Sequence, residues 1–301
     1  MYNGVIVVYK EAGFTSHDVV AKLRGILQQK KIGHTGTLDP AAVGVLPVCL
    51  GAATKLCEHF TDKEKEYAAT MRLGMVSDTQ DIGDGATVLA ERQVTVSESE
   101  VEAAALSFLG GYWQTPPMYS ALKVDGRKLY ELARAGKEVE RKSRFVEISE
   151  LEILRTALPE VELRLVCAKG TYVRTLCHDI GEKLGCGAVM AALCRTRAGE
   201  FALDDALTLG QVEGLVADGR IDAAIRPVDS FFQDLPRITI AEEHLRLVMN
   251  GNKLAAAQVT MDGEIADTEQ IRVYDGTGAF YGIYQYKQKE GIFTPVKMFL
   301  T

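Results

Sequence analysis

Residues 161–184, with the sequence VELRLVCAKGTYVRTLCHDIGEKL, decide the fold class of this chain of 301 residues. In the first seven residues apolar side chains occupy every second position, which predicts a strand with one buried face. After Gly170 the apolar period changes to three or four, at Val173, Leu176, Ile180 and Leu184. That spacing predicts a helix that stops at Gly185. A strand therefore passes into a helix through a glycine turn.

Other segments add strands and helices without a regular alternation of the two. Residues 5–8 predict a buried strand, followed by a helix that we expect Ser16 to cap. Ser97 and Glu100 form a capping box for a later helix. Residues 33–54 hold four Gly and two Pro, which predicts loops and turns rather than the interior of an element. We therefore expect an α+β fold with a mixed, mainly antiparallel central sheet and flanking helices.

The C-terminal part of the sequence is different. Beyond a change of composition near residues 227–236, two β-rich runs at 271–274 and 279–286 are joined by Asp-Gly-Thr-Gly, a hairpin signal. We place a domain at residues 1–234 and a small β domain at residues 235–301.

Charge is distributed unevenly along the chain. The whole sequence carries a formal charge of −7, which excludes a uniformly basic coat. Residues 121–144, however, hold eight Lys and Arg against four Asp and Glu, and residues 22–39 hold four against one. Residues 201–270 hold five against thirteen. A basic surface on an acidic body is typical of phosphate binding, although a solvated charged face gives the same pattern.

Several classes of protein are disfavoured. We expect no secretory or membrane segment, because the apolar run at 5–8 is too short and the uncharged stretch at 103–122 contains Gly, Pro and polar residues. The six Cys form no CxxC pair, which favours reduced thiols in a cytoplasmic protein. The five His have no metal-ligand spacing, and no P-loop or GxGxxG is present, so we expect neither a metal nor a nucleotide cofactor.

The segment GHTGTLDP at 33–40 is the densest candidate site. Its only acid, Asp39, is either a turn former or a nucleophile or base. An aspartate in a partly apolar cavity needs a cation to stay ionised, and the candidates are Arg174, Arg195 and Arg197. Tyr67, after a run of charged residues, either begins a strand or offers a flat ring on which a base can stack.

Taken together, the motifs resemble those of the bacterial TruB-type tRNA pseudouridine synthases. The segments that carry the resemblance are GFTS (13–16), GHTGTLDPAAVGVLP (33–47), Tyr67 with RLG (72–74), SDTQD (77–81), PPMYSALK (116–123), KGTYVRTL (169–176) and LCRTR (193–197). Such enzymes isomerise uridine at position 55 in the TΨC loop of tRNA. The resemblance implies a stand-alone tRNA pseudouridine-55 synthase that flips its target base and needs no cofactor and no metal.

The same resemblance implies roles for individual residues. Asp39 would be the catalytic aspartate, Arg174 its ion-pair partner, and Tyr67 the ring that stacks on uracil. The residues implied in substrate binding are His34 where RNA enters, Leu193 and Tyr172 at the pocket, and Lys123, Arg127 and Lys128 in a basic RNA-gripping insertion at about 116–144. Residues 235–301 resemble an RNA-binding PUA domain.

The chemistry leaves some choices open. One ionised carboxylate can act as a nucleophile or as a base, at the sugar or at the ring. The expected partner is the T-arm stem-loop of tRNA, bound by a monomer without a protein partner or a membrane. The alternatives are a non-catalytic RNA-binding or RNA-folding protein on the same scaffold, and a guide-RNA-dependent synthase of the related Cbf5 type.

Overall fold

The fold was analysed in a computed structural model that describes residues 1–83, 85–124, 126–261 and 263–300. Its centre is an eight-stranded sheet with the order β1-β3-β13-β4-β12-β11, to which β2 is added beside β3 and β14 beside β13. Neighbouring strands are antiparallel except β13 and β3, which run parallel. The predicted α+β class with a mixed, mainly antiparallel sheet is confirmed.

The strands and helices outside the C-terminal part have the following residue bounds. The strands of the central sheet are β1 (Gly4–Lys10), β2 (Ile32–His34), β3 (Val43–Leu50), β4 (Lys65–Leu73), β11 (Ile148–Ala157), β12 (Glu160–Cys167), β13 (Ala188–Ala198) and β14 (Phe201–Ala202). Three two-stranded ribbons pair β5 (Met75–Ser77) with β6 (Val88–Glu91), β7 (Tyr112–Gln114) with β10 (Arg144–Val146), and β8 (Lys123–Val124) with β9 (Arg127–Lys128). The helices are α1 (Ser16–Ile26), α2 (Cys57–Thr61), α3 (Glu98–Leu106), α4 (Leu129–Arg134), α5 (Val173–Lys183) and α6 (Leu209–Ala217).

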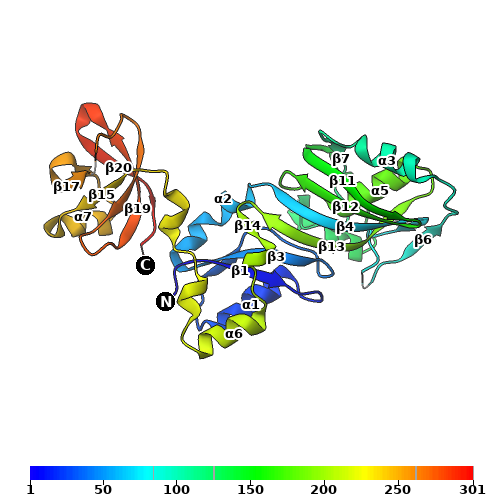
Figure 1. The fold of residues 1–301 in the computed structure, drawn as a ribbon, viewed down its shortest axis with the longest axis horizontal. Coiled ribbons are helices and arrows are strands. Elements are labelled where there is room, and N and C mark those ends of the chain that lie inside the picture. The colour runs from blue at the N-terminus through cyan, green and yellow to red at the C-terminus, as the bar shows by residue number, and fades with distance from the viewer. Residues whose placement is uncertain (84, 125, 262, 301) are drawn as a thin grey trace.

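The helices cover different ends of the central sheet (Figure 1). Helices α1 and α6 lie side by side against β1 and β3, where Val19, Leu23 and Val212 are buried in one apolar cluster. Helices α3 and α5 pack at the other end, where Leu176 and Ile180 join a cluster that also contains Tyr67. The site described below lies where these two parts of the sheet meet, along β3, β4 and β13.

The C-terminal part forms a sheet of its own with the order β16-β20-β19-β18-β15-β17. Its elements are β15 (Arg237–Ile240), α7 (Leu245–Met249), β16 (Leu254–Ala255), β17 (Val259–Met261), β18 (Gln270–Tyr274), β19 (Phe280–Lys287) and β20 (Ile292–Met298). The predicted hairpin is β18–β19. This sheet is not detached from the rest, because Ile283 and Phe299 pack into the apolar cluster that contains Val5 and Phe60.

Two local expectations were wrong. Residues 43–50, expected to be loop, form the strand β3, of which Gly44–Leu50 are buried, and Pro47 lies inside it opposite Val7. The helix after β1 is capped by Thr15, in a capping box with Asp18, rather than by Ser16. Ser16 is buried and serves another purpose, described below. Over the part of the chain that the structure describes, no helix combines the length and apolar character that crossing a membrane requires.

Candidate active site

Asp39 lies in the loop between β2 and β3, and the backbone on both sides of it is fixed. The amide of Leu38 donates to Ser16 Oγ at 2.9 Å. The fully buried Lys10 donates through Nζ to the carbonyl oxygens of Ala42 at 2.5 Å, Pro40 at 3.0 Å and Glu11 at 3.1 Å. Burial lowers the pKa of Lys10 to about 8. A buried cation and a buried hydroxyl therefore hold the loop that presents Asp39.

Arg195 of β13 also holds the loop that presents Asp39. Its guanidinium, 1% exposed, donates from Nε to Val45 O at 2.7 Å and from Nη2 to Gly36 O at 3.1 Å. The two strands can approach here because Gly44 has a φ of +107°, and a Cβ at this position would lie 2.3 Å from the carbonyl oxygen of Arg195. Gly44 is therefore required for the β3–β13 contact that carries Arg195 beneath the loop.

Arg174, the second residue of α5, makes the ion pair with Asp39. Its Nη1 lies 3.4 Å from Asp39 Oδ2, and the Arg174 side chain is 5% exposed whereas that of Asp39 is 37% exposed. Of the three arginines considered from the sequence, Arg174 is the one paired with Asp39 among the described residues. Its Nη2 also donates to the carbonyl oxygen of Tyr119. A buried arginine thus orients a half-exposed carboxylate.

A second carboxylate, which sequence reasoning missed, shares the same arginine. Asp81 Oδ2 lies 3.5 Å from Arg174 Nη1, while Asp81 Oδ1 accepts from Thr79 Oγ1 at 2.7 Å and from Gly83 N at 3.2 Å. Asp81 ends the SDTQD motif, but nothing within that motif connects it to an arginine 93 residues away. Arg174 is therefore held between two acids, of which Asp81 is the more buried.

The surroundings of Asp39 act on its ionisation in opposite directions. Burial raises the pKa of the Asp39 carboxyl above its ordinary value, and the charge of Asp81 adds to that effect. The Arg174 guanidinium and, more weakly, the Lys10 ammonium lower it. Burial prevails, so the net pKa is raised. The two cations therefore favour the ionised form of Asp39 against the effect of burial.

Tyr67 and Leu193 lie on adjacent central strands. Tyr67 of β4 is buried in the cluster that also contains Leu38, next to Asp39, and Leu193 packs against this cluster from β13. Burial raises the pKa of the Tyr67 phenol, and the neighbouring Arg195 guanidinium opposes that rise. Tyr67 is therefore a neutral ring at neutral pH, suited to packing against another flat apolar surface.

His34 ends β2 at the start of the Asp39 loop. Its ring packs edge-on against His17 of α1, with centroids 5.2 Å apart. Burial, together with the charges of His17 and Arg195, lowers the pKa of His34 to about 4. At neutral pH His34 is uncharged, so it can stack or hydrogen-bond but cannot act as a cation.

Tyr172 lies directly before α5, two residues from Arg174. The Arg174 guanidinium lies over its ring, 5.8 Å from the centroid. The Tyr172 backbone is fixed by Gln114 of β7, which accepts from Tyr172 N at 2.9 Å and donates to Tyr172 O at 3.0 Å. Sequence reasoning did not identify Gln114, which is fully buried.

The basic insertion projects between β7 and β10. Lys123, Arg127 and Lys128 lie on the small ribbon β8–β9, where Lys123 pairs with Lys128 in register. Lys123 and Arg127 are exposed, whereas Lys128 Nζ donates to Tyr130 Oη at 3.3 Å and lies over that ring. Asp125, between the two strands, is outside the described residues. Within the part described, these three cations make no contact with Asp39, Tyr67 or Arg174.

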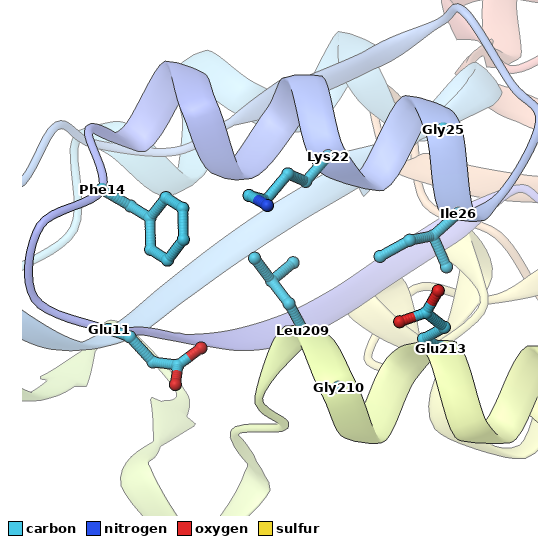
Figure 2. A pocket seen from close by; sticks show the side chains of 8 residues that line it. All are labelled: Glu11, Phe14, Lys22, Gly25, Ile26, Leu209, Gly210 and Glu213. Carbon is cyan, nitrogen blue, oxygen red and sulfur yellow. The ribbon is translucent and has the colours of Figure 1, made fainter.

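A groove of about 470 Å³ lies between α1 and α6, apart from these residues. Figure 2 shows Phe14, Lys22 and Ile26 on one side, facing Leu209 and Glu213 on the other. Lys22 Nζ lies 5.0 Å from the centroid of the Phe14 ring. None of the predicted site residues lines this groove. Among the residues that the structure describes, no group of three or more His, Cys, Asp and Glu is arranged to hold a metal ion.

The sequence was compared with known families and proteins. Residues 24–173 match the N-terminal domain of the TruB family of pseudouridylate synthases, and residues 174–233 match the C-terminal domain of tRNA pseudouridylate synthase B. A protein of Lachnoclostridium phytofermentans named tRNA pseudouridine synthase B is 48% identical, covering 99% of this chain and 100% of its own. One of the same name from Levilactobacillus brevis is 42% identical, covering 99% of each.

Solved structures with this fold were also found. A chain in a Cbf5-Nop10-Gar1 complex aligns with a TM-score of 0.68 and 28% identity, covering 99% of this chain and 85% of that one. A chain of an H/ACA ribonucleoprotein bound to a substrate RNA containing 2′-deoxyuridine aligns with a TM-score of 0.67 and 27% identity over the same shares.

Proposed function

The chain belongs to the TruB family of pseudouridylate synthases, and we propose that it isomerises uridine to pseudouridine in the TΨC loop of tRNA, at position 55, without a protein partner. Full-length relatives that are named tRNA pseudouridine synthase B support tRNA as the substrate. The observation that carries the proposal is the Asp39–Arg174 ion pair on a fixed loop beside a buried tyrosine ring.

This constellation suits the reaction. The isomerisation breaks the bond between N1 of uracil and C1′ of the ribose, turns the base and joins C5 to C1′. The proton lost from C5 is balanced by one gained at N1, and no oxidant or reductant takes part. The demand on the protein is therefore one well-oriented group at the reacting atoms, which is Asp39 acting as nucleophile or base.

Arg174 and Tyr67 would make that chemistry possible. Arg174 favours the ionised form of Asp39 and, because its Nη1 is also held by Asp81, aims the carboxylate. Tyr67 offers a neutral ring against which the displaced uracil can pack. A base inside a folded loop must first leave its stack, at a cost of a few kcal/mol, and such packing offsets part of that cost.

The remaining sites would bind the rest of the RNA. We propose that His34 contacts the T-loop, that Leu193 and Tyr172 border the uracil pocket, and that the insertion at 116–144 contacts phosphates through Lys123, Arg127 and Lys128. We further propose that residues 235–301 are a PUA-like domain that adds RNA contacts without touching the reacting base.

The test is chemical mapping of pseudouridine in RNA incubated with the purified chain alone. The substrates are a full tRNA transcript, its isolated T-arm stem-loop, and the same stem-loop with cytidine in place of the target uridine. We expect one modified position in the first two RNAs and none in the third. The matched variants are Asp39→Asn, which removes the charge, and Asp205→Asn, which changes an exposed aspartate outside the site.

Each alternative predicts another result. A non-catalytic RNA-binding protein would retain the stem-loop but yield no pseudouridine. A guide-RNA-dependent synthase, the class suggested by the structural neighbours, would yield product only after guide RNA and partner proteins are added. Modification of the tRNA outside the T-loop would keep the reaction but refute the proposed position.

A further inference from the structure

The ribbon β7–β10 connects the basic insertion to the catalytic arginine. The insertion leaves the fold at the end of β7 and returns at the start of β10. At the point where the insertion joins the ribbon, Gln114 of β7 and Arg144 of β10 are cross-strand partners. Both side chains turn to the same place, the Gly170–Tyr172 turn that precedes α5, where Gln114 holds the backbone of Tyr172.

Arg144 holds the other side of this turn. Its guanidinium lies over the Tyr172 ring, 5.2 Å from the centroid, and its Nη2 donates to the carbonyl oxygen of Gly170. Gly170, with a φ of +81°, makes room for it, because a Cβ there would lie 3.3 Å from the Arg144 guanidinium carbon. The Arg174 guanidinium lies over the same ring at 5.8 Å. The guanidinia of Arg144 and Arg174 therefore both lie against the Tyr172 ring, which connects the insertion to the Asp39 ion pair.

We propose that Arg144 is a positioning residue for the reaction, which acts through the Tyr172 ring to fix Arg174 against Asp39 and so couples the insertion to the chemistry. Two observations favour this role over a simple phosphate contact. The guanidinium is turned inward onto a ring and a backbone carbonyl, and its Nε is buried. A second contact connects the same two parts, because Arg174 donates to the carbonyl oxygen of Tyr119 near the other end of the insertion.

The inference rests on the proposed role of Arg174. A guanidinium over an aromatic ring is a modest attraction, but its removal frees the ring on which Arg174 rests. Small displacements of a group that orients a reacting atom have large effects on rate. Arg144 should therefore matter for the rate of the bound complex more than for its formation. This distinguishes it from Arg141, three residues earlier, which donates to Pro116 O at 3.0 Å and pairs with Glu138 at 3.2 Å.

The experiment measures single-turnover pseudouridine formation at saturating enzyme, together with the dissociation constant of the T-arm stem-loop. For Arg144→Met we expect a rate about tenfold lower and a dissociation constant within about threefold of the unchanged chain. Arg144→Lys, which keeps a cation over the ring, should recover most of the loss. Arg141→Met removes a charge from the same insertion, and its rate should exceed that of Arg144→Met at least about fivefold.

A further variant controls for the loss of any stacked arginine. Arg226 lies over the Phe231 ring at 4.6 Å, outside the site and the insertion, and Arg226→Met should keep its rate within about twofold. Should Arg144→Met melt below the assay temperature, Arg144→Gln, which keeps a polar side chain, replaces it.

The outcomes separate the inference from the function on which it rests. Equal rates for the Arg144 and Arg141 variants, or a loss confined to the dissociation constant, would overturn the role of Arg144. So would an Arg144→Lys rate as low as that of Arg144→Met. In each of these cases a slow Arg174→Met variant would leave the proposed function standing. If Arg174→Met is as fast as the unchanged chain, the proposed role of Arg174 fails as well.

Discussion

The two sheets of the molecule differ in what they bury. Around the central sheet, Lys10, Lys65, Arg174 and Arg195 are all at most 5% exposed. The core of the C-terminal sheet is formed by side chains such as Ile238, Val273 and Phe293, and Asp275 is the one buried charged residue in its described part. The described core of the C-terminal sheet therefore buries a single charged side chain, whereas the central sheet buries several charges at a high desolvation cost.

The form of that burial shows what the charges are for. Asp275 accepts hydrogen bonds from its own turn, at Thr277 N and Ala279 N, so its charge is satisfied locally. Lys10, Arg174 and Arg195 instead reach across the chain to the loop around Asp39. A buried ion costs several kcal/mol in desolvation unless partners compensate it. This difference indicates that Lys10, Arg174 and Arg195 are retained to fix the loop around Asp39, and it can be tested by removing charges one region at a time.

The largest effect is expected for Asp39→Asn. The substitution keeps the size of the side chain but removes the only acid of the loop, so pseudouridine formation should fall by at least about 10³-fold while RNA affinity stays within a few-fold. The measurement is single-turnover product formation beside filter binding. Asp275→Asn, the matched change in the C-terminal sheet, should leave the rate nearly unaltered. If Asp39→Asn reacts as fast as the unchanged chain, the charges of the central sheet matter no more for the reaction than those of the C-terminal sheet.

The next largest effect is expected for Arg174→Met. The arginine lowers the pKa of Asp39 against the effect of burial, so its removal must raise that pKa further. The rate at neutral pH should fall by about 10²-fold, and the acid limb of the rate profile should move to higher pH, with partial recovery as pH rises and Asp39 ionises. The rate of Arg174→Lys should lie between that of Arg174→Met and that of the unchanged chain, because the point charge of lysine cannot reproduce the planar fork of the guanidinium.

The control for this prediction is Arg237→Met in the C-terminal sheet, where the guanidinium lies 4.2 Å from the centroid of the Tyr274 ring. Its pH profile should coincide with that of the unchanged chain. A flat profile for Arg174→Met, with the rate near that of the unchanged chain, would show that the ion pair does not govern the ionisation of Asp39.

A smaller effect is expected from the exposed charges of the insertion. Replacing Lys123, Arg127 and Lys128 by Ala should reduce the steepness of log affinity against log salt by about two. Three full phosphate contacts would change it by more, but Lys128 is already engaged by Tyr130. The same change in the C-terminal part, at Lys287, Lys289 and Lys297, should lower the slope by less than about one. Equal slopes for the two triple variants would show that the insertion has no special part in binding RNA.

The sequence predicted elements whose signal is local. The strand–glycine–helix junction appears as β12 and α5, and the Ser97 capping box begins α3. Strand β3 was missed because Gly44 and Pro47 resemble loop residues. Gly44 is needed only because the backbone of Arg195, far along the chain, comes so close. The composition of residues 43–50 does not indicate that the backbone of Arg195 lies so close to Gly44.

The same reasoning explains what was found and missed in the site. Asp39 stands out because it is the only acid in a glycine-rich loop. The residue pattern alone left Arg174 as one of three arginines, and the family resemblance singled it out. Asp81 lies 93 residues from Arg174, and no periodicity joins them. Gln114 and Arg144 resemble ordinary polar strand residues until the register pairs them beneath Tyr172. Constellations formed by long-range strand pairing are invisible to patterns with a period of two or four.

The smallest effect on chemistry is expected from deleting residues 235–301. Among the described residues of this segment, none contacts Asp39, Tyr67 or Arg174, so the single-turnover rate at saturating enzyme should stay within about twofold. The dissociation constant of tRNA should rise about tenfold or less, because contacts outside the reacting loop are lost.

The deletion should also lower the stability of the remaining chain, because the two parts share an apolar cluster. Ile283 and Phe299 are buried in the cluster that contains Val5 and Phe60, and their removal exposes apolar surface at the edge of the central sheet. Losing even one buried aromatic residue costs about 3–5 kcal/mol, so the truncated chain should melt several degrees lower, and its rate must be measured below that midpoint.

A substitution that keeps the C-terminal sheet isolates the contribution of that interface. Phe299→Leu retains an apolar side chain and should lower the melting temperature by less than the deletion does, while affinity and rate remain those of the full chain. If the deletion abolishes turnover although the shortened chain is folded, then the C-terminal sheet supports the Asp39 loop through this shared cluster. The separation between a central sheet that carries the chemistry and a C-terminal sheet that adds only RNA contacts would then fail.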